Sequence, residues 1–231
     1  YKRGVRFVNI PTSLLGMVDA SSGGKTGVDL HHYKNMVGLF AFPEIVIIDP
    51  VFLQTLPDKE WKNGIAEILK HAILADLELW NRIRLELRNT TGAGVSQTLQ
   101  NSIVSLLPAS IKVKAHIVTI DPYEKQERKF LNFGHTIGHA LESYSLKNDN
   151  DPLSHGEAVA VGMICESLLS VKLCGLSLDV LDEISTVISG FFKPARIPKT
   201  AYQDMIHLMK ADKKSENDLM TFTLIKNLKE P

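Results

Sequence analysis

The sequence predicts a short α/β portion followed by an all-α domain. Two β-rich runs, 5–10 and 44–48, carry the first part of this prediction. Continuous apolar runs of this kind suit strands that are covered on both faces, as in an α/β sheet. After Pro57 the apolar residues recur at helical spacing instead. We therefore expect a boundary there, with 1–57 as the α/β part and 58–231 as the helical domain.

Each later element follows from its own pattern. Asp58 is the expected N-cap of the first helix, in which Trp61, Ile65 and Ile68 recur at helical spacing. The same pattern predicts helices over 58–76, 77–88, 95–117, 133–146, 155–174 and 178–190. The remaining expectations are a Gly-rich loop at 19–35, a surface loop at 147–151 and a single strand at 219–225.

The composition indicates a soluble globular protein without a strong field of either sign. Lys+Arg and Asp+Glu are equal at 26 each, so neither nucleic acid nor an anionic membrane is an expected partner. No stretch reaches the ~20 apolar residues of a membrane span. Cys165 and Cys174 lack CxxC spacing, and we expect buried free thiols in a reducing cytoplasm. Tyr1 opens a loop without the layout of a signal peptide, so the chain is expected to begin inside a fold.

The segment Asn132-Phe-Gly-His135-Thr-Ile-Gly-His139-Ala-Leu-Glu142 is the most informative one. Asn132 can cap a helix, and His135 and His139 then lie four residues apart on one face. Such a pair can hold a divalent metal, although two histidines on a polar helix face are the commoner outcome of isolated HxxxH spacing. The glycines at 134 and 138 would let a neighbouring helix or a ligand approach closely.

Two further segments supply possible ligands. Ser154-His-Gly-Glu157 has the form of a capping box, so His155 would open a new helix. The small residues that follow His155 indicate that this helix is buried, and a buried histidine is costly unless it is ligated or paired. The alternative interpretation is an exposed histidine at the start of the helix. Glu67 lies in an apolar helix three residues before Lys70, where a solvated ion pair is the alternative. One glutamate with two histidines is the composition of an open zinc site.

The Gly-rich segment 19–27 invites comparison with a P-loop. A Walker A motif that ended at Gly24-Lys25-Thr26 would need glycine at position 19, which is Asp19, so an ATPase is rejected. The glycines still permit close approach of a ligand to the backbone. Lys25 and Lys34, with the neighbouring Asn35, offer cations and polar groups to a phosphate or carboxylate.

Taken together, these segments resemble the signature segments of the 3-dehydroquinate synthase family. The resemblance rests on 19–27, Lys34-Asn35, 64–70, 132–139 and 155–157, which occur in the family's order and span nearly the whole chain. It implies a Rossmann-like NAD-binding domain, here truncated at its start, before an α-helical domain. It also implies an active site in the cleft between the domains, a homodimer, and a cytoplasmic lyase of the shikimate pathway.

The resemblance assigns roles to individual residues. The family's metal ligands match Glu67, His135 and His155, whereas His139 matches a residue of acid/base and substrate chemistry. Glu124 matches a proton-transfer position, and the remaining catalytic positions match Lys70, Lys25 and Asn132. Substrate contacts carry over to Arg3, Asp19, Lys25, Asn35, Lys70, Lys114, Arg128, Asn132 and Lys213. NAD contacts match Thr12, Ser13, Lys34, Phe52, Leu53, Gln54, Thr55 and Asn63.

The implied substrate is 3-deoxy-D-arabino-heptulosonate 7-phosphate, whose carboxylate and phosphate suit the cationic side chains. NAD would transiently oxidise a ring alcohol, phosphate would leave by β-elimination, the hydride would return, and an aldol step would close the carbocycle to 3-dehydroquinate. A divalent metal, zinc before cobalt, would lower the pKa of bound hydroxyls. Without the family's pyrophosphate turn, we expect the 231-residue chain alone not to turn over.

Other interpretations remain open. Another sugar phosphate cyclase, of the valiolone or deoxy-inosose synthase type, shares the scaffold, but segment 23–27 and Lys34-Asn35 favour the dehydroquinate branch. An iron-dependent alcohol dehydrogenase lacks this run of cations. A non-catalytic interaction module is motivated by the truncated start and opposed by the intact metal set. Asp29, where the family commonly has asparagine, and the slightly long loop 147–153 depart from the pattern; we expect neither to touch a ligand.

Overall fold

The structure, a computed structural model, describes residues 4–30, 33–88, 90, 94–193, 197–211 and 220–231. Its first part holds four short strands in two pairs. Strand β1 (Val8–Asn9) pairs in parallel with β4 (Ile45–Val46), and β2 (Val28–Leu30) pairs antiparallel with β3 (Tyr33–Val37). Both predicted strands are thus present but shorter than expected.

The predicted loop at 19–35 is not a continuous loop. It contains a 3-10 turn at Ala20–Ser22 and the β2–β3 pair. Just before it, helix α1 (Leu14–Val18) begins at Ser13, whose hydroxyl accepts a hydrogen bond from the Gly16 amide at 3.2 Å. The α1 side chains Leu14, Met17 and Val18 are buried and pack on α2, so this short helix fixes the start of the Gly-rich segment against the helical domain.

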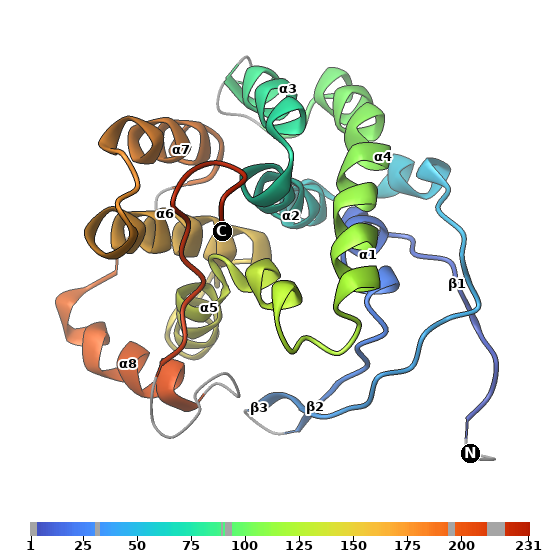
Figure 1. Cartoon of the computed structure of the whole chain (residues 1–231), viewed down its shortest axis with the longest axis horizontal. Coiled ribbons are helices and arrows are strands. Elements are labelled where there is room, and N and C mark those ends of the chain that lie inside the picture. The colour runs from blue at the N-terminus through green and yellow to red at the C-terminus, as the bar shows by residue number, and fades with distance from the viewer. Residues whose placement is uncertain (1–3, 31–32, 89, 91–93, 194–196, 212–219) are drawn as a thin grey trace.

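Seven longer helices make up most of the rest of the described chain, with 3-10 helices at Pro50–Thr55, Glu127–Asn132 and Lys199–Ala201. The longer helices are α2 (Asp58–Ala75), α3 (Leu77–Arg88), α4 (Gln97–Ile120), α5 (His135–Asn148), α6 (His155–Cys174), α7 (Leu178–Phe191) and α8 (Tyr202–Ala211). Helix α2 lies at the centre, with α4 on one side and α6 on the other (Figure 1). Every position from 63 to 74 of α2 is buried, as expected of a helix that is covered all round. The centre of the domain therefore receives Glu67 and Lys70.

Helix α4 is long and apolar enough to cross a membrane by length and composition alone. This contradicts the expectation that no segment would meet that test, but one such helix is weak evidence. The helix packs on α1, α2 and α3. Its Lys114 is buried and pairs with Asp19, so we interpret α4 as a core helix of the domain.

Several local expectations are wrong. Residues 220–225 form no strand; instead the Thr221 carbonyl accepts from the Thr136 hydroxyl at 2.9 Å. Asp58 does not cap α2, because it is the first helical residue and its carboxylate accepts from the Val95 amide at 3.1 Å. Asn132 does not cap α5, whose N-cap is a left-handed Gly134 with φ of 78°. Helix α8 was not expected, and the two free cysteines are half-buried rather than fully buried.

Candidate active site and metal centre

One carboxylate and two imidazoles from three helices converge in the interior. Oε1 of Glu67 on α2 lies 3.4 Å from Nε2 of His135, the first residue of α5, and 3.6 Å from Nε2 of His155, the first residue of α6. The three donor atoms all lie within 4.8 Å of one another. The capping box predicted at Ser154 and Glu157 is confirmed, and it sets the start of α6 at His155.

The other nitrogen of each imidazole is engaged elsewhere, which orients the ring. Nδ1 of His135 lies 3.1 Å from the Phe133 carbonyl, and Nδ1 of His155 lies 3.3 Å from Oε2 of Glu142. Since both partners only accept hydrogen bonds, we assign the proton of each neutral ring to Nδ1. In the neutral form of each ring, the lone pair on Nε2 then faces Glu67, and ligating histidines are commonly held in this way.

The two oxygens of Glu67 have different surroundings. Oε2 accepts from the ammonium of Lys70, and both side chains are buried, so the solvated ion pair considered from the sequence is excluded. Oε1 is buried and has no hydrogen-bond partner. A buried carboxylate oxygen without a donor is costly, and a cation between Oε1 and the two Nε2 atoms would remove that cost.

The electrostatics of the cluster keep the carboxylate ionised. Burial opposes ionisation of Glu67, but Lys70 and His135 hold its pKa well below the ordinary value. Burial and the nearby Lys70 lower the pKa of His135 to about 3, so that this imidazole is neutral. Burial also disfavours charge on His155, but the neighbouring carboxylates of Glu142 and Glu67 raise its pKa to about 9. A metal at this position would therefore replace a proton on His155.

Close contact between α5 and α6 brings His135 and His155 together, as the glycines at 134 and 138 suggested. A Cβ at Gly138 would lie 3.0 Å from the Val159 Cα, and a Cβ at Gly162 would lie 1.9 Å from the Gly134 carbonyl oxygen. The buried carboxylate of Glu166 on α6 accepts from the Gly134 amide at 2.7 Å and the Ile137 amide at 3.4 Å. Glu166 thus caps α5 from the neighbouring helix, which the sequence alone did not reveal.

Cationic side chains predicted to bind substrate contact carboxylates and a backbone carbonyl. Lys114 on α4 pairs with Asp19. Lys25 pairs with Glu124, whose Oε1 also accepts from the Asn132 side chain at 2.7 Å. The buried Arg128 donates to the Gly23 carbonyl at 2.6 Å. The Gly-rich segment is therefore tied to the helical domain by its predicted substrate-binding residues.

A second group of possible metal ligands, Asp19, Glu67 and His71, shares Glu67 with the first. The ammonium groups of Lys70 and Lys114 contact its two carboxylates. Two cations in contact with these carboxylates oppose a further divalent ion. The first cluster, Glu67 with His135 and His155, is therefore the better candidate.

His139 lies beside the first cluster without belonging to it. Its ring centroid is 5.2 Å from that of His135 and 6.0 Å from that of His155. Arg3 and Lys213 lie outside the described residues, and so do the side chains of Lys34 and Asn35. These four assignments stay predictions.

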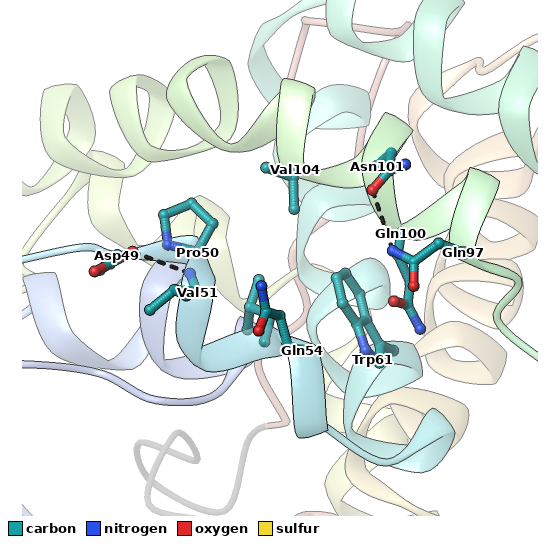
Figure 2. A pocket seen from close by; sticks show the side chains of 10 residues that line it. Asp49, Pro50, Val51, Gln54, Trp61, Gln97, Gln100, Asn101 and Val104 are labelled. Carbon is teal, nitrogen blue, oxygen red and sulfur yellow. Dashed lines mark hydrogen bonds between the residues drawn. The ribbon is translucent and has the colours of Figure 1, made fainter.

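The residues expected to contact NAD differ in how exposed they are. Thr12, Phe52, Gln54 and Thr55 are exposed, whereas Leu53 is buried in the core. Asn63 is buried and its side-chain oxygen accepts from the Gly156 amide at 2.8 Å, which ties α2 to the first turn of α6. Gln54 also borders a pocket of about 360 Å³, beside Trp61 and Gln100 (Figure 2). The residues that line this pocket do not include Glu67, His135 or His155.

Comparisons with known proteins agree with these features. A family model described as 3-dehydroquinate synthase N-terminal matches residues 1–63, and one described as 3-dehydroquinate synthase C-terminal matches residues 64–215. The 3-dehydroquinate synthase of Parabacteroides distasonis is 41% identical over 99% of this chain and 62% of its own length. That of Legionella pneumophila (strain Lens) is 40% identical over 98% of this chain and 59% of its own length. The chain thus spans about three fifths of these relatives.

Solved structures of two related enzymes superpose on the whole chain. The 2-epi-5-epi-valiolone synthase of Streptomyces hygroscopicus subsp. jinggangensis 5008, solved with NAD+ and Zn2+ bound, gives a TM-score of 0.83 at 27% identity and is covered over 62% of its length. A 2-deoxy-scyllo-inosose synthase complexed with carbaglucose-6-phosphate, NAD+ and Co2+ gives 0.78 at 22% identity and is covered over 61%, which shows a shared fold. On the two family models and the close curated relatives, the chain belongs to the 3-dehydroquinate synthase family.

Proposed function

We propose that this chain carries the catalytic centre of a 3-dehydroquinate synthase, a phosphorus–oxygen lyase. It would convert 3-deoxy-D-arabino-heptulosonate 7-phosphate to 3-dehydroquinate and phosphate with transient use of NAD. The observation that carries the proposal is the buried, unpartnered Oε1 of Glu67, which faces two imidazole Nε2 atoms. The 41% identity to a curated 3-dehydroquinate synthase favours this branch over the valiolone synthase, which is 27% identical.

Glu67, His135 and His155 would hold one divalent ion, zinc or alternatively cobalt. The donor set fits, because one carboxylate oxygen and two neutral imidazole nitrogens make up an open zinc site. The related valiolone synthase was solved with Zn2+. When bound, the ion would lower the pKa of substrate hydroxyls and so assist their oxidation. Lys70 holds the second oxygen of Glu67, which leaves Oε1 as the single carboxylate donor.

The surrounding residues would bind and orient the substrate. Lys25, Lys114 and Arg128 would attract its phosphate and carboxylate, because guanidinium forks and ammonium groups suit those anions. An incoming anion at Lys25 would compete with Glu124. His139, beside the donor cluster, and Glu124 would move protons to and from the substrate.

The wider organisation is also part of the proposal. We assign 1–57 to a NAD-binding domain and 58–231 to the metal- and substrate-binding domain of a cytoplasmic homodimer. Thr12, Ser13, Lys34, Asn63 and segment 52–55 would contact NAD. No nucleic acid or membrane partner is expected, because positive and negative residues balance at 26 each.

Two measurements on the complete protein test the function. Crystals grown with zinc should give an anomalous peak bound by Glu67, His135 and His155; a peak on other side chains would refute the metal assignment. Phosphate release should require both NAD and the heptulosonate phosphate. A phosphorylated sugar without a carboxylate should release phosphate far more slowly, and the opposite preference would place the protein among the other sugar phosphate cyclases.

A further inference from the structure

A buried histidine outside the proposed metal site lies behind a proposed substrate contact. His71 on α2 has no exposed surface, and neither does Ser110 on α4. Nδ1 of His71 lies 2.8 Å from the Ser110 hydroxyl oxygen. Nε2 lies 3.9 Å from Oδ1 of Asp19 and has no hydrogen-bond partner in the described part of the chain.

The contacts decide which tautomer is present. If Nδ1 carried the proton, the lone pair on Nε2 would face the carboxylate of Asp19, which is repulsive. If the Ser110 hydroxyl donates to Nδ1, the proton lies on Nε2 and its positive end points at Asp19. Burial and the charge on Lys70 also lower the pKa of His71 to about 3, so the ring is neutral near pH 7. The favoured state is therefore a neutral ring protonated at Nε2.

His71 and Lys114 lie beside the same oxygen of Asp19. Lys114 pairs with Oδ1, and Nε2 of His71 faces Oδ1 from the α2 side. At 3.9 Å the imidazole acts as a dipole near a charge and not as a direct hydrogen-bond donor. In a buried site of low dielectric such a dipole keeps much of its strength. With Lys114 paired to Oδ1 and the His71 dipole facing the same oxygen, rotation of the Asp19 carboxylate is restricted.

We propose that His71, with its tautomer set by Ser110, is a positioning residue that holds Asp19 in the orientation that binds substrate. A Ser–His–Asp set often marks a nucleophile, but Ser110 has no exposed surface and cannot meet a substrate. The inference rests on the proposed function, because the role of Asp19 as a substrate contact comes from resemblance to the 3-dehydroquinate synthase family.

Variants of the complete, zinc-loaded protein test the proposal. His71→Leu removes the dipole and fills the same space with an apolar side chain. KM for the heptulosonate phosphate should then rise about tenfold, with a smaller change in kcat. His71→Gln retains a side-chain N–H and should restore KM to within about threefold of the wild type. Zinc content should stay unchanged in both. Equal effects of leucine and glutamine, or an unchanged KM with leucine, would overturn the proposal.

Two further measurements separate this inference from the proposed function. In an Asp19→Asn background, His71→Leu should have little further effect, because the two residues act as one unit; additive losses would refute the coupling. Nitrogen-15 NMR should show His71 protonated at Nε2 in the wild type, and Ser110→Ala should weaken that preference. A wild type that binds zinc, shows this tautomer and releases no phosphate would refute the function but not the tautomer.

Discussion

Replacing Gly162 with alanine should damage the proposed metal site from a distance. A Cβ at this position would lie 1.9 Å from the Gly134 carbonyl oxygen, whereas real contacts of this kind are essentially never below 3.0 Å. The obstruction is backbone, so no side-chain rotation can relieve it. Helices α5 and α6 would have to separate by about 1.1 Å, the difference between those two distances.

That separation exceeds what a metal site tolerates. His135 begins α5 and His155 begins α6, and ligand distances are held to roughly 0.2 Å in functional sites. We expect Gly162→Ala to lower zinc affinity by at least about 10–100-fold, the range seen when supporting groups are lost. Overpacking of the same contact should lower the free energy of unfolding by about 1–3 kcal/mol or more.

Gly190 provides a matched control on α7. A Cβ there meets nothing within 4 Å, so Gly190→Ala should leave zinc affinity unchanged and raise stability by about 0.5–1 kcal/mol. Zinc affinity would be measured by competition with a chelator, and stability by chemical denaturation of the metal-free chain. If Gly162→Ala matched the control in both assays, the argument that the α5–α6 contact sets the donor geometry would be wrong.

Two further predictions concern acid/base groups. His139→Ala should retain near-stoichiometric zinc and lose about 10²–10⁴-fold in kcat, as expected for loss of a general acid or base; loss of zinc in parallel would make His139 a ligand. Asp121 accepts hydrogen bonds from the amides of Lys125, Gln126 and Arg128, which outweigh its burial and lower its pKa below 3.8. Its stabilising effect is thus present above pH 3.8 and lost as the pH falls through the lowered pKa. Asp121→Asn should melt at a lower temperature than the wild type near neutral pH, with a difference that shrinks in acid; a constant difference would exclude this linkage.

The helical part of the fold was largely predictable because caps and apolar periodicity are local features of the sequence. Helix α6 spans 155–174 as expected, since a capping box marks its start and Gly175 its end. Helix α3 also matches its predicted range of 77–88. The residues alone indicated a zinc site of one glutamate and two histidines, but the choice of His135 and His155 over His139 came from the family resemblance, because three separate helices contribute to the cluster.

Other features depend on contacts that a linear sequence hides. The N-terminus of α5 is capped by Glu166, which is 32 residues away in the chain, so Asn132 was the more obvious candidate and proved wrong. The segment 220–225 has an apolar, β-rich sequence, yet the Ile225 amide bonds to the Ser170 hydroxyl at 3.1 Å and not to a strand. Glu142 contacts His155, and Ser110 contacts His71, across 13 and 39 residues of sequence, so the sequence pattern did not assign either pair a role.

The divided role of Glu67 constrains how this position can change over evolutionary time. One oxygen serves Lys70 and the other faces the two imidazoles, so the side chain meets two separate demands at once. Aspartate is one methylene shorter and cannot reach both sides, and glutamine would turn an amide hydrogen toward one of them. A single substitution at position 67 should therefore be selected against, because it would lose one of these two contacts. A different residue at this position would need compensating changes at position 70 and at one of the histidines.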